Sequence, residues 1–297
     1  ERTVLLDLHP ISYKDKNLIN YYSNFINTSS YEYSFNSLYL WKDLCKTNLT
    51  TIYDTLVIQK YDDEKGFFFM MPYYKNVESL YKTLDYLKSN YENYQYLLGD
   101  IDSDHIELLK NNYDLEILEN KKSFEYIYLT SDLINLKGKK YHKKRNHYNN
   151  FINLYNYNYS SINNEKIIED CLDLLNKWEN KKCICSKELL IEPIAVKNIL
   201  YSLDDLSLKS IALYVDNKLV GFSIGEKFKD SAIIHIEKCN ANYRGVYAFI
   251  NNEFLKTSFS DTIYVNRQED CGHEGLQKSK ESYHPYKVLN KYFIKIK

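Results

Sequence analysis

The stretch that decides the fold is 261-DTIYVNRQEDCGHEGLQKSKESYHP-285. Its first residues, Asp261–Val265, combine apolar and β-branched side chains in a pattern that predicts a buried strand. The chain then becomes polar and charged and enters a short helical pattern through Leu276 that ends near Pro285. Because open α/β sheets usually bind ligands at the carboxyl ends of their strands, we expect a ligand site where this strand ends. A solvated loop with a capped helix start is the alternative interpretation of the same spacing.

The segments before this stretch alternate between helical and strand patterns. The predicted helices are Glu165–Lys181, Val196–Leu203 and Tyr247–Phe254, and the predicted strands are Ser210–Asp216, Leu219–Phe228, Ser231–Cys239 and Asp261–Val265. Two helices thus precede an antiparallel meander of three strands, which a glycine-containing turn, a helix, a strand, a helix and a last strand follow. This is the element order of a GCN5-related N-acetyltransferase (GNAT) fold.

The first half of the chain follows the same order more loosely. Helices precede a hairpin that turns at Asp62–Gly66, and helices and strands alternate after it until the pattern changes around Leu133–Gly138. We therefore predict an α/β (α+β) chain of two tandem GNAT-like domains, residues 1–133 and 134–297. Each domain is expected to hold a mixed, largely antiparallel sheet flanked by helices, and the second is expected to carry the active site.

Composition indicates an ordinary globular protein. Of the 297 residues, 44% are hydrophobic and 27% are charged, a balance that excludes an intrinsically disordered chain. The net charge of −1 excludes a globally basic nucleic-acid binder but leaves a local basic patch open. The 31 Tyr accompany many Asn, Lys and Ile residues, whose codons are all A/T-rich, so genome composition explains this bias more simply than function does.

Cysteine usage and hydropathy predict a cytoplasmic protein with free thiols. The six Cys form no CxxC pair, and Cys183 and Cys185 are too close together for zinc-finger spacing, so we expect no metal site. No signal peptide is visible, and no apolar run approaches the ~20 residues that a membrane-spanning helix needs. Peripheral contact with a membrane stays open.

Positive charge is concentrated in 137-KGKKYHKKRNH-147, which holds five Lys and one Arg. The spacing distributes these charges around a helix, as expected for a solubilising linker. The alternative is an anion-binding surface for the phosphates of RNA, a nucleotide or a lipid head group. Because the rest of the chain is neutral to acidic, we favour the second interpretation. It makes Lys143, Lys144, Arg145 and Asn146 the candidate phosphate- or donor-binding residues.

Several segments together resemble the C-terminal domain of phosphatidylglycerol lysyltransferases and their soluble relatives. The matching segments are SFNSLYLWKD at 34–43, GKKYHKKRNHYNNF at 138–151, VGFSIGE at 220–226, IHIEKCN at 234–240, INNEFLK at 250–256 and VNRQEDCGHEGLQKSKESYHP at 265–285. The resemblance implies tandem GNAT-like domains, as in enzymes that transfer an amino acid from aminoacyl-tRNA to a lipid or peptide. It does not identify a substrate.

This chain departs from the family pattern in two ways. It lacks the membrane-spanning region of the lipid-modifying members, which puts a bilayer lipid acceptor in doubt. In addition, Gln268 and Gln277 stand where the family tends to have an acid and an arginine.

The turn that corresponds to the coenzyme A-binding loop of GNAT enzymes matches the usual pattern of that loop poorly. Its usual pattern, Arg/Gln-x-x-Gly-x-Gly/Ala, holds a pyrophosphate on backbone N–H groups. The equivalent turn here is Asn242-Tyr243-Arg244-Gly245-Val246-Tyr247, in which only Gly245 fits and the bulky Tyr247 stands where a phosphate must approach. We therefore expect a donor other than acyl-CoA, such as aminoacyl-tRNA, whose ester is already activated.

Acyl transfer needs a base, donors for the oxyanion and a group that protonates what leaves. Glu237, at the end of a strand, is the candidate base, and Tyr283 is the candidate proton donor. Each has a structural alternative, namely an ion pair for Glu237 and packing for Tyr283. The candidate substrate-binding residues are His235, Asn266, Arg267, Asp270 and Lys280, with His235 expected on the same strand face as Glu237.

Three functional hypotheses follow. The first is an acyl- or aminoacyl-transferase whose donor carries phosphate, as aminoacyl-tRNA does, and whose acceptor is open. The second is an acyl-CoA-dependent N-acyltransferase. The third is a non-catalytic module that binds a small molecule or RNA, which the uncharged Gln268 and Gln277 keep open.

Overall fold

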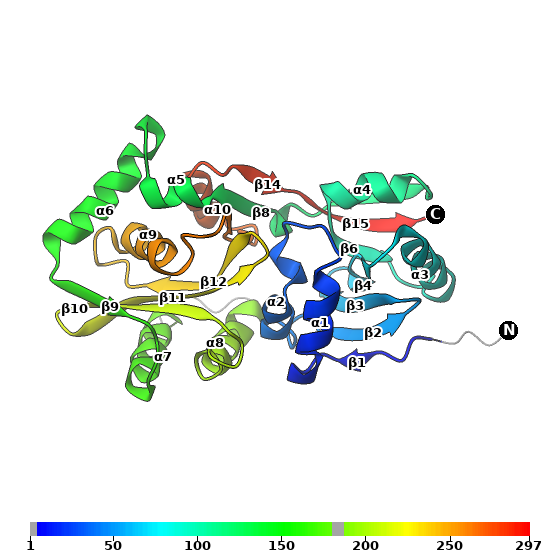
Figure 1. Ribbon diagram of the computed structural model, residues 1–297, viewed down its shortest axis with the longest axis horizontal. Coiled ribbons are helices and arrows are strands. Elements are labelled where there is room, and N and C mark those ends of the chain that lie inside the picture. The colour runs from blue at the N-terminus through cyan, green and yellow to red at the C-terminus, as the bar shows by residue number, and fades with distance from the viewer. Residues whose placement is uncertain (1–4, 180–186) are drawn as a thin grey trace. The chain divides into compact units, whose positions relative to one another are not determined.

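The computed structural model describes residues 5–179 and 187–297 and consists of two compact units (Figure 1). The first unit comprises Glu1–Glu125 and Leu289–Lys297, and the second comprises Tyr126–Val288. Cys183, Cys185 and the end of the predicted helix Glu165–Lys181 lie outside the described residues. The second unit therefore begins eight residues before the predicted boundary at 133/134, and the last nine residues return to the first unit.

The observed boundaries differ from the predicted ones because one strand from each half of the sequence belongs to the sheet of the other half. The strand β8 (Glu125–Leu129) lies between β13 (Tyr264–Asn266) and β14 (Lys287–Leu289) of the second sheet. The last strand, β15 (Lys291–Ile296), lies between β6 (Leu98–Asp102) and β7 (Leu115–Glu119) of the first sheet. A strand pattern in the sequence shows which side chains are buried but not which strand is the partner, so the exchange could not be predicted.

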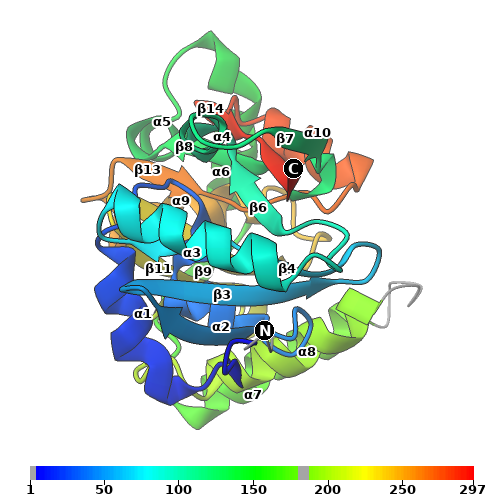
Figure 2. The ribbon, with the colours of Figure 1, turned by 90° about the vertical axis from the view of Figure 1, so that its right-hand side faces the viewer.

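The first unit contains a sheet in the order β1-β2-β3-β4-β6-β15-β7, with β5 pairing β3 (Figure 2). Its remaining elements are β1 (His9–Pro10), α1 (Lys16–Ser23), α2 (Phe35–Leu40), β2 (Asn48–Ile52), β3 (Thr55–Asp62), β4 (Gly66–Phe69), β5 (Tyr73–Tyr74), α3 (Val77–Asn90) and α4 (Ser103–Lys110). A buried ion pair fixes the returning strand β15, because Lys291 Nζ lies 2.6 Å from Glu125 Oε1 and donates to Ser30 Oγ at 2.6 Å. Since breaking such a pair leaves a buried charge uncompensated, it specifies where the chain end docks.

The second unit contains a sheet in the order β14-β8-β13-β12-β11-β10-β9. Its remaining elements are α5 (Thr130–Asn135), α6 (His142–Leu154), β9 (Tyr157–Ser160), α7 (Glu165–Glu179), α8 (Lys187–Leu200), β10 (Lys209–Val215), β11 (Lys218–Phe228), β12 (Ser231–Cys239), α9 (Val246–Ser258) and α10 (Glu274–Glu281). Helices α6 and α9 lie on one face of the meander β10–β12, and α7 and α8 lie on the other (Figure 1). Aromatic side chains fill the core under α9, where the rings of Phe151 and Phe249 stack 4.6 Å apart.

Both sheets are mixed, as predicted. Antiparallel ladders join most neighbouring strands, while β4 and β6 of the first sheet and β12 and β13 of the second run parallel. The predicted strand Asp261–Val265 corresponds to β13, which is shorter and begins three residues later, since only Tyr264–Asn266 pairs with β12. Helix α8 begins at Lys187 instead of Val196 and includes Pro193, a residue that the sequence pattern takes as a helix boundary.

Candidate functional site

The site begins where the parallel strands β12 and β13 separate. Their pairing covers only three positions, from Ser231 opposite Tyr264 to Ile233 opposite Asn266. Beyond this point β12 continues to Cys239, whereas the other chain leaves the sheet after Asn266 and forms a polar loop. This separation of the two strands, called the opening below, therefore lies at the carboxyl ends of both strands, where the sequence predicted a ligand site.

An ion pair between Glu237 and Arg267 occupies this opening. Glu237 Oε1 lies 3.0 Å from Arg267 Nη2, and the side chains are 11% and 13% exposed. Asn251 of α9 donates from Nδ2 to the other carboxylate oxygen at 3.3 Å. Nη1 of Arg267 is buried and meets no acceptor in hydrogen-bonding geometry among the described residues. One guanidinium nitrogen is thus closed to solvent and without an acceptor, while both oxygens of the predicted base are engaged.

Tyr283, the predicted proton donor, packs against Arg267. The guanidinium carbon lies 4.9 Å from the centroid of the tyrosine ring, and only 5% of the residue is exposed. Burial raises the pKa of Tyr283 to about 12, although the charge of Arg267 acts in the opposite direction. The phenol therefore keeps its proton at neutral pH, which is the state that a proton donor requires.

Lys144 of α6 reaches the same tyrosine. Its Nζ lies 3.8 Å from the ring centroid of Tyr283, and the residue is half-buried. Burial lowers the pKa of Lys144 to about 8, and the positive charge of Arg267 adds to this effect. Within the part of the chain that the structure describes, Lys144 has no carboxylate within ion-pair distance. The sequence placed this lysine among donor-binding residues and did not associate it with Tyr283.

Lys280 holds the loop after β13 in place. Its ammonium donates to the backbone carbonyl oxygens of Arg267, at 2.6 Å, of Gln268, at 3.1 Å, and of Glu269. Burial lowers the pKa of Lys280 to about 8, an effect that nearby acidic side chains partly oppose. Because an ammonium has three hydrogens, all of its donors are used by the loop. Its role in substrate binding stays a prediction, and in this geometry the ammonium holds the loop.

Asn266 and Asp270 shape the two ends of this loop. Asn266 is fully buried, and its Oδ1 accepts from the backbone N–H of Gln268 at 2.8 Å. Asp270 accepts from the Tyr126 hydroxyl at 2.6 Å and from the Gly272 N–H at 2.8 Å. Their predicted contacts with a substrate remain predictions.

His235 lies apart from Glu237, contrary to the expectation that the two share a strand face. The register of β11 and β12 shifts between Ile224 and Gly225, which interrupts the alternation of side chains at this point. His235 Nε2 lies 2.8 Å from Glu226 Oε1, and Gln268 Nε2 lies 3.2 Å from His235 Nδ1. A simple period of two cannot anticipate such a bulge. His235 therefore supports the Gln268 side of the loop.

The basic segment forms the helix α6, and its cations have different surroundings. Arg145 donates from Nη1 to the carbonyl oxygens of Leu136 and of Gly138, the latter at 2.7 Å. It thereby closes the left-handed turn that ends α5. Lys144 turns towards Tyr283, as described above, whereas Lys143 and Asn146 line a surface pocket. The predicted group of four donor-binding residues is thus divided among three places.

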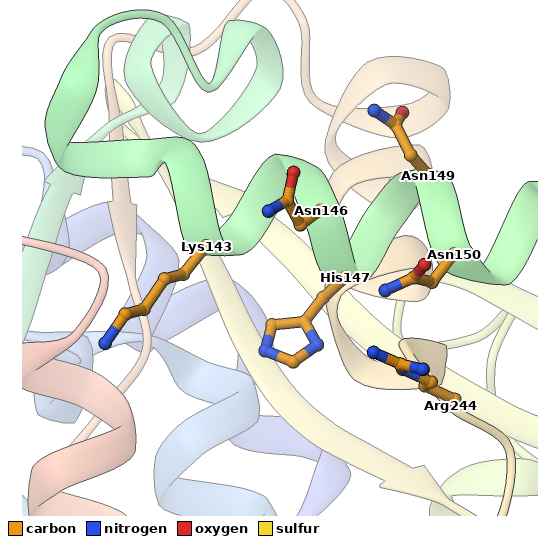
Figure 3. Close-up of a pocket in the computed structure, with 6 residues that line it drawn as sticks. All are labelled: Lys143, Asn146, His147, Asn149, Asn150 and Arg244. Atoms are coloured by element: carbon orange, nitrogen blue, oxygen red, sulfur yellow. The ribbon is translucent and has the colours of Figure 1, made fainter.

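This pocket, which we call the α6 pocket, has a volume of about 400 Å³. Its lining residues are Lys143, Asn146, His147, Asn149, Asn150 and Arg244. Figure 3 shows Lys143 and His147 leaving the same side of α6, with Arg244 beside the helix. Lys143, His147 and Asn150 follow helical i, i+4, i+7 spacing, a signal in the sequence that could have identified this face.

Gly245 brings Arg244 to the helix. Its φ is +84°, and a Cβ on this residue would lie 2.0 Å from the carbonyl oxygen of His147. Only glycine permits this conformation together with such a close approach of two backbones. The turn that GNAT enzymes use for coenzyme A is therefore packed against α6. Tyr247 is fixed as well, because its hydroxyl donates to the Cys239 carbonyl oxygen at 3.2 Å.

The sequence profile of the family "Phosphatidylglycerol lysyltransferase, C-terminal" matches residues 23–295. An uncharacterised protein of Mycoplasmoides gallisepticum is 30% identical over 218 residues, which cover 72% of this chain and 70% of that protein. In the described residues no helix is both long and apolar enough to cross a membrane.

Solved structures show the same fold. A conserved protein of unknown function from Bacteroides thetaiotaomicron has a TM-score of 0.90 at 31% identity, covering 99% of this chain and 100% of that one. L-PGS from Bacillus licheniformis has a TM-score of 0.64 at 12% identity, covering 94% of this chain and 91% of that one, so it shows the fold alone. FemX and a tandem GNAT protein share the fold as well, which confirms the predicted fold class.

The resemblance inferred from the quoted segments is confirmed over nearly the whole sequence. The chain belongs to the family of phosphatidylglycerol lysyltransferase C-terminal domains.

Proposed function

We propose that this protein transfers an aminoacyl group from aminoacyl-tRNA to an acceptor that carries a nucleophilic hydroxyl or amine. The observation that carries the proposal is the buried guanidinium of Arg267, whose Nη1 lacks an acceptor while Glu237 holds its other terminal nitrogen. A donor fixed in this way suits the oxyanion that develops when an ester carbonyl is attacked. Family membership supports acyl transfer as the reaction class.

The surroundings of Arg267 supply the other requirements of acyl transfer. Tyr283 is protonated and in contact with the guanidinium, so it can stabilise or protonate a developing negative charge. The α6 pocket, lined by Lys143 and Arg244, offers cations that suit backbone phosphates of a tRNA acceptor end. Acyl-CoA is less well supported as donor, because the backbone at Gly245 is packed against His147.

The proposal is tested by incubating the protein with a mixed pool of aminoacyl-tRNA labelled in the amino acid and with phosphatidylglycerol vesicles. We expect label to move from tRNA to the lipid or to water, and Arg267→Gln to reduce the rate by about 10²–10³-fold, as loss of an oxyanion donor does. Acetyl-CoA serves as the competing donor. Transfer from acetyl-CoA alone would replace the proposal with the acyl-CoA-dependent alternative, and no transfer from either donor would favour a binding module.

Salt dependence tests the α6 pocket separately. Each phosphate contact that is lost should lower the slope of log affinity against log salt by about 1. We therefore expect Lys143→Ala and Arg244→Ala to weaken tRNA binding and to reduce this slope. Lys110→Ala is the control, because Lys110 lies on α4 of the first unit and pairs with Glu107 at 3.0 Å. Equal slopes in all these variants would remove the pocket from the proposal.

A further inference from the structure

The proposed function does not yet use Lys144, and the surroundings of this residue are unusual for a lysine. It leaves α6 beside Lys143, but it does not line the α6 pocket. Its Nζ instead lies 3.8 Å from the ring centroid of Tyr283, whose ring also carries Arg267 at 4.9 Å. The lysine therefore points at the groups that surround the reacting ester in the proposed reaction.

None of the charged groups described around Lys144 offers its ammonium a negative partner. Arg267 is positive and already paired with Glu237, and Tyr283 is uncharged at neutral pH. On its own helix and the preceding turn, Lys140 lies 3.2 Å from Asp132 Oδ2, and Arg145 is bound to carbonyl oxygens. His284, the neighbour of Tyr283, has its Nε2 3.1 Å from the Lys140 carbonyl oxygen.

A half-buried amine beside a fixed cation, with no carboxylate opposite it, loses its proton more readily than an ordinary lysine does. We propose that Lys144 is the general base that deprotonates the acceptor in aminoacyl transfer. This inference rests on the proposed function and assigns Lys144 a different role from phosphate binding. Its low pKa, about 8, provides a neutral fraction near physiological pH, as proton transfer requires.

The reaction balances with Lys144 as the proton carrier, so that Tyr283 stabilises negative charge and keeps its own proton. The acceptor oxygen or nitrogen forms a bond to the ester carbonyl carbon while its proton passes to the neutral Nζ of Lys144. The carbonyl electrons move to the oxygen that Arg267 Nη1 faces. When the intermediate collapses, the carbonyl re-forms, the bond to the ribose oxygen breaks, and the ammonium of Lys144 returns its proton to that oxygen. Lys144 ends neutral, and Glu237 remains the partner of Arg267.

The titration of Lys144 can be measured without any substrate. Reductive methylation with ¹³C-formaldehyde labels the lysines, and the signal absent from Lys144→Arg assigns the residue. We expect a midpoint near 8. In Arg267→Gln the midpoint should rise, because a neighbouring cation is removed. A midpoint at about 10.4, the value of an unperturbed lysine, would overturn the proposal whatever the enzyme's activity is.

Kinetics then separate a base from an anion anchor. Lys144→Arg keeps the positive charge but cannot lose a proton at physiological pH, so an anchor would survive this change and a base would not. With mixed aminoacyl-tRNA and phosphatidylglycerol vesicles we expect kcat to fall about 10²–10⁴-fold at unchanged KM. The rise of kcat with pH through about 8 should disappear. Methylamine should partly restore Lys144→Ala, while Lys143→Ala should lose affinity and gain nothing from the amine.

The outcomes distinguish this inference from the proposed function. Full activity of Lys144→Arg would refute the base and leave aminoacyl transfer intact. A wild-type protein that transfers nothing from charged tRNA would refute both. Loss of kcat in Lys144→Arg together with a midpoint near 8 and rescue of Lys144→Ala by methylamine supports both.

Discussion

Replacing Gly245 by alanine should destabilise the second unit through one contact. The added Cβ would lie 2.0 Å from the His147 carbonyl oxygen, whereas ordinary contact begins at 3.4 Å, so the two backbones must separate by 3.4 − 2.0 = 1.4 Å. Overpacking of this kind costs about 1–3 kcal/mol. The left-handed conformation, with φ of +84°, adds roughly 1–2 kcal/mol for a residue with a Cβ.

Gly138 provides a comparison without the contact. Its φ is +86° and its ψ is 174°, whereas Gly245 has a ψ of 1°, and a Cβ on Gly138 meets nothing within 4 Å. Gly138→Ala should therefore cost only backbone strain, roughly 1–3 kcal/mol for this extended region of positive φ. Gly245→Ala adds the approach of the Arg244–Gly245 turn to α6 to a strain of its own.

Hydrogen exchange of the α9 amides in increasing urea can follow the second unit alone, because α9 lies within that unit. We expect Gly245→Ala to lose more free energy of unfolding than Gly138→Ala, because it adds an overpacking cost of about 1–3 kcal/mol. It should also bind tRNA more weakly, because Arg244 is displaced. Equal losses in the two variants would refute the reasoning, since strain without contact would then explain both.

Three further predictions concern the opening between β12 and β13. Glu237→Gln should lower the free energy of unfolding of the second unit by about 3 kcal/mol, because it leaves the Arg267 charge uncompensated. In urea unfolding, the double variant Glu237→Gln/Arg267→Gln should lose less free energy than the two single variants together. The raised pKa of Tyr283, about 12, stabilises the fold fully below pH about 10, and this contribution should be lost as pH rises from about 10 to 12. Tyr283→Phe should show a shallower decline in that window, and an identical decline would contradict the shift. Lys280→Met removes the donor to three carbonyl groups, so amide exchange should accelerate in residues 266–271; unchanged protection would show that the loop does not depend on it.

The patterns of neighbouring residues were sufficient to predict much of the fold and the region of the candidate site. The alternating pattern of Ser231–Cys239 and the polar run after Asn266 identified the strand and the loop that border the opening. These features depend on period and composition, which neighbouring residues carry by themselves. The order of elements, compared with a known family, extended the prediction to a tandem GNAT fold.

The arrangement of partners depended on tertiary structure. The pairing of Lys291 with Glu125 joins the last strand to the first unit, and a register shift separates His235 from Glu237. Lys144 and Tyr283 are far apart in the sequence, and only the packing of α6 brings them together. Charge, period and propensity are properties of short segments, whereas burial and the pKa values that follow from it depend on which segments meet. For that reason the sequence could suggest residues for the candidate site, whereas their contacts with one another depended on the tertiary structure.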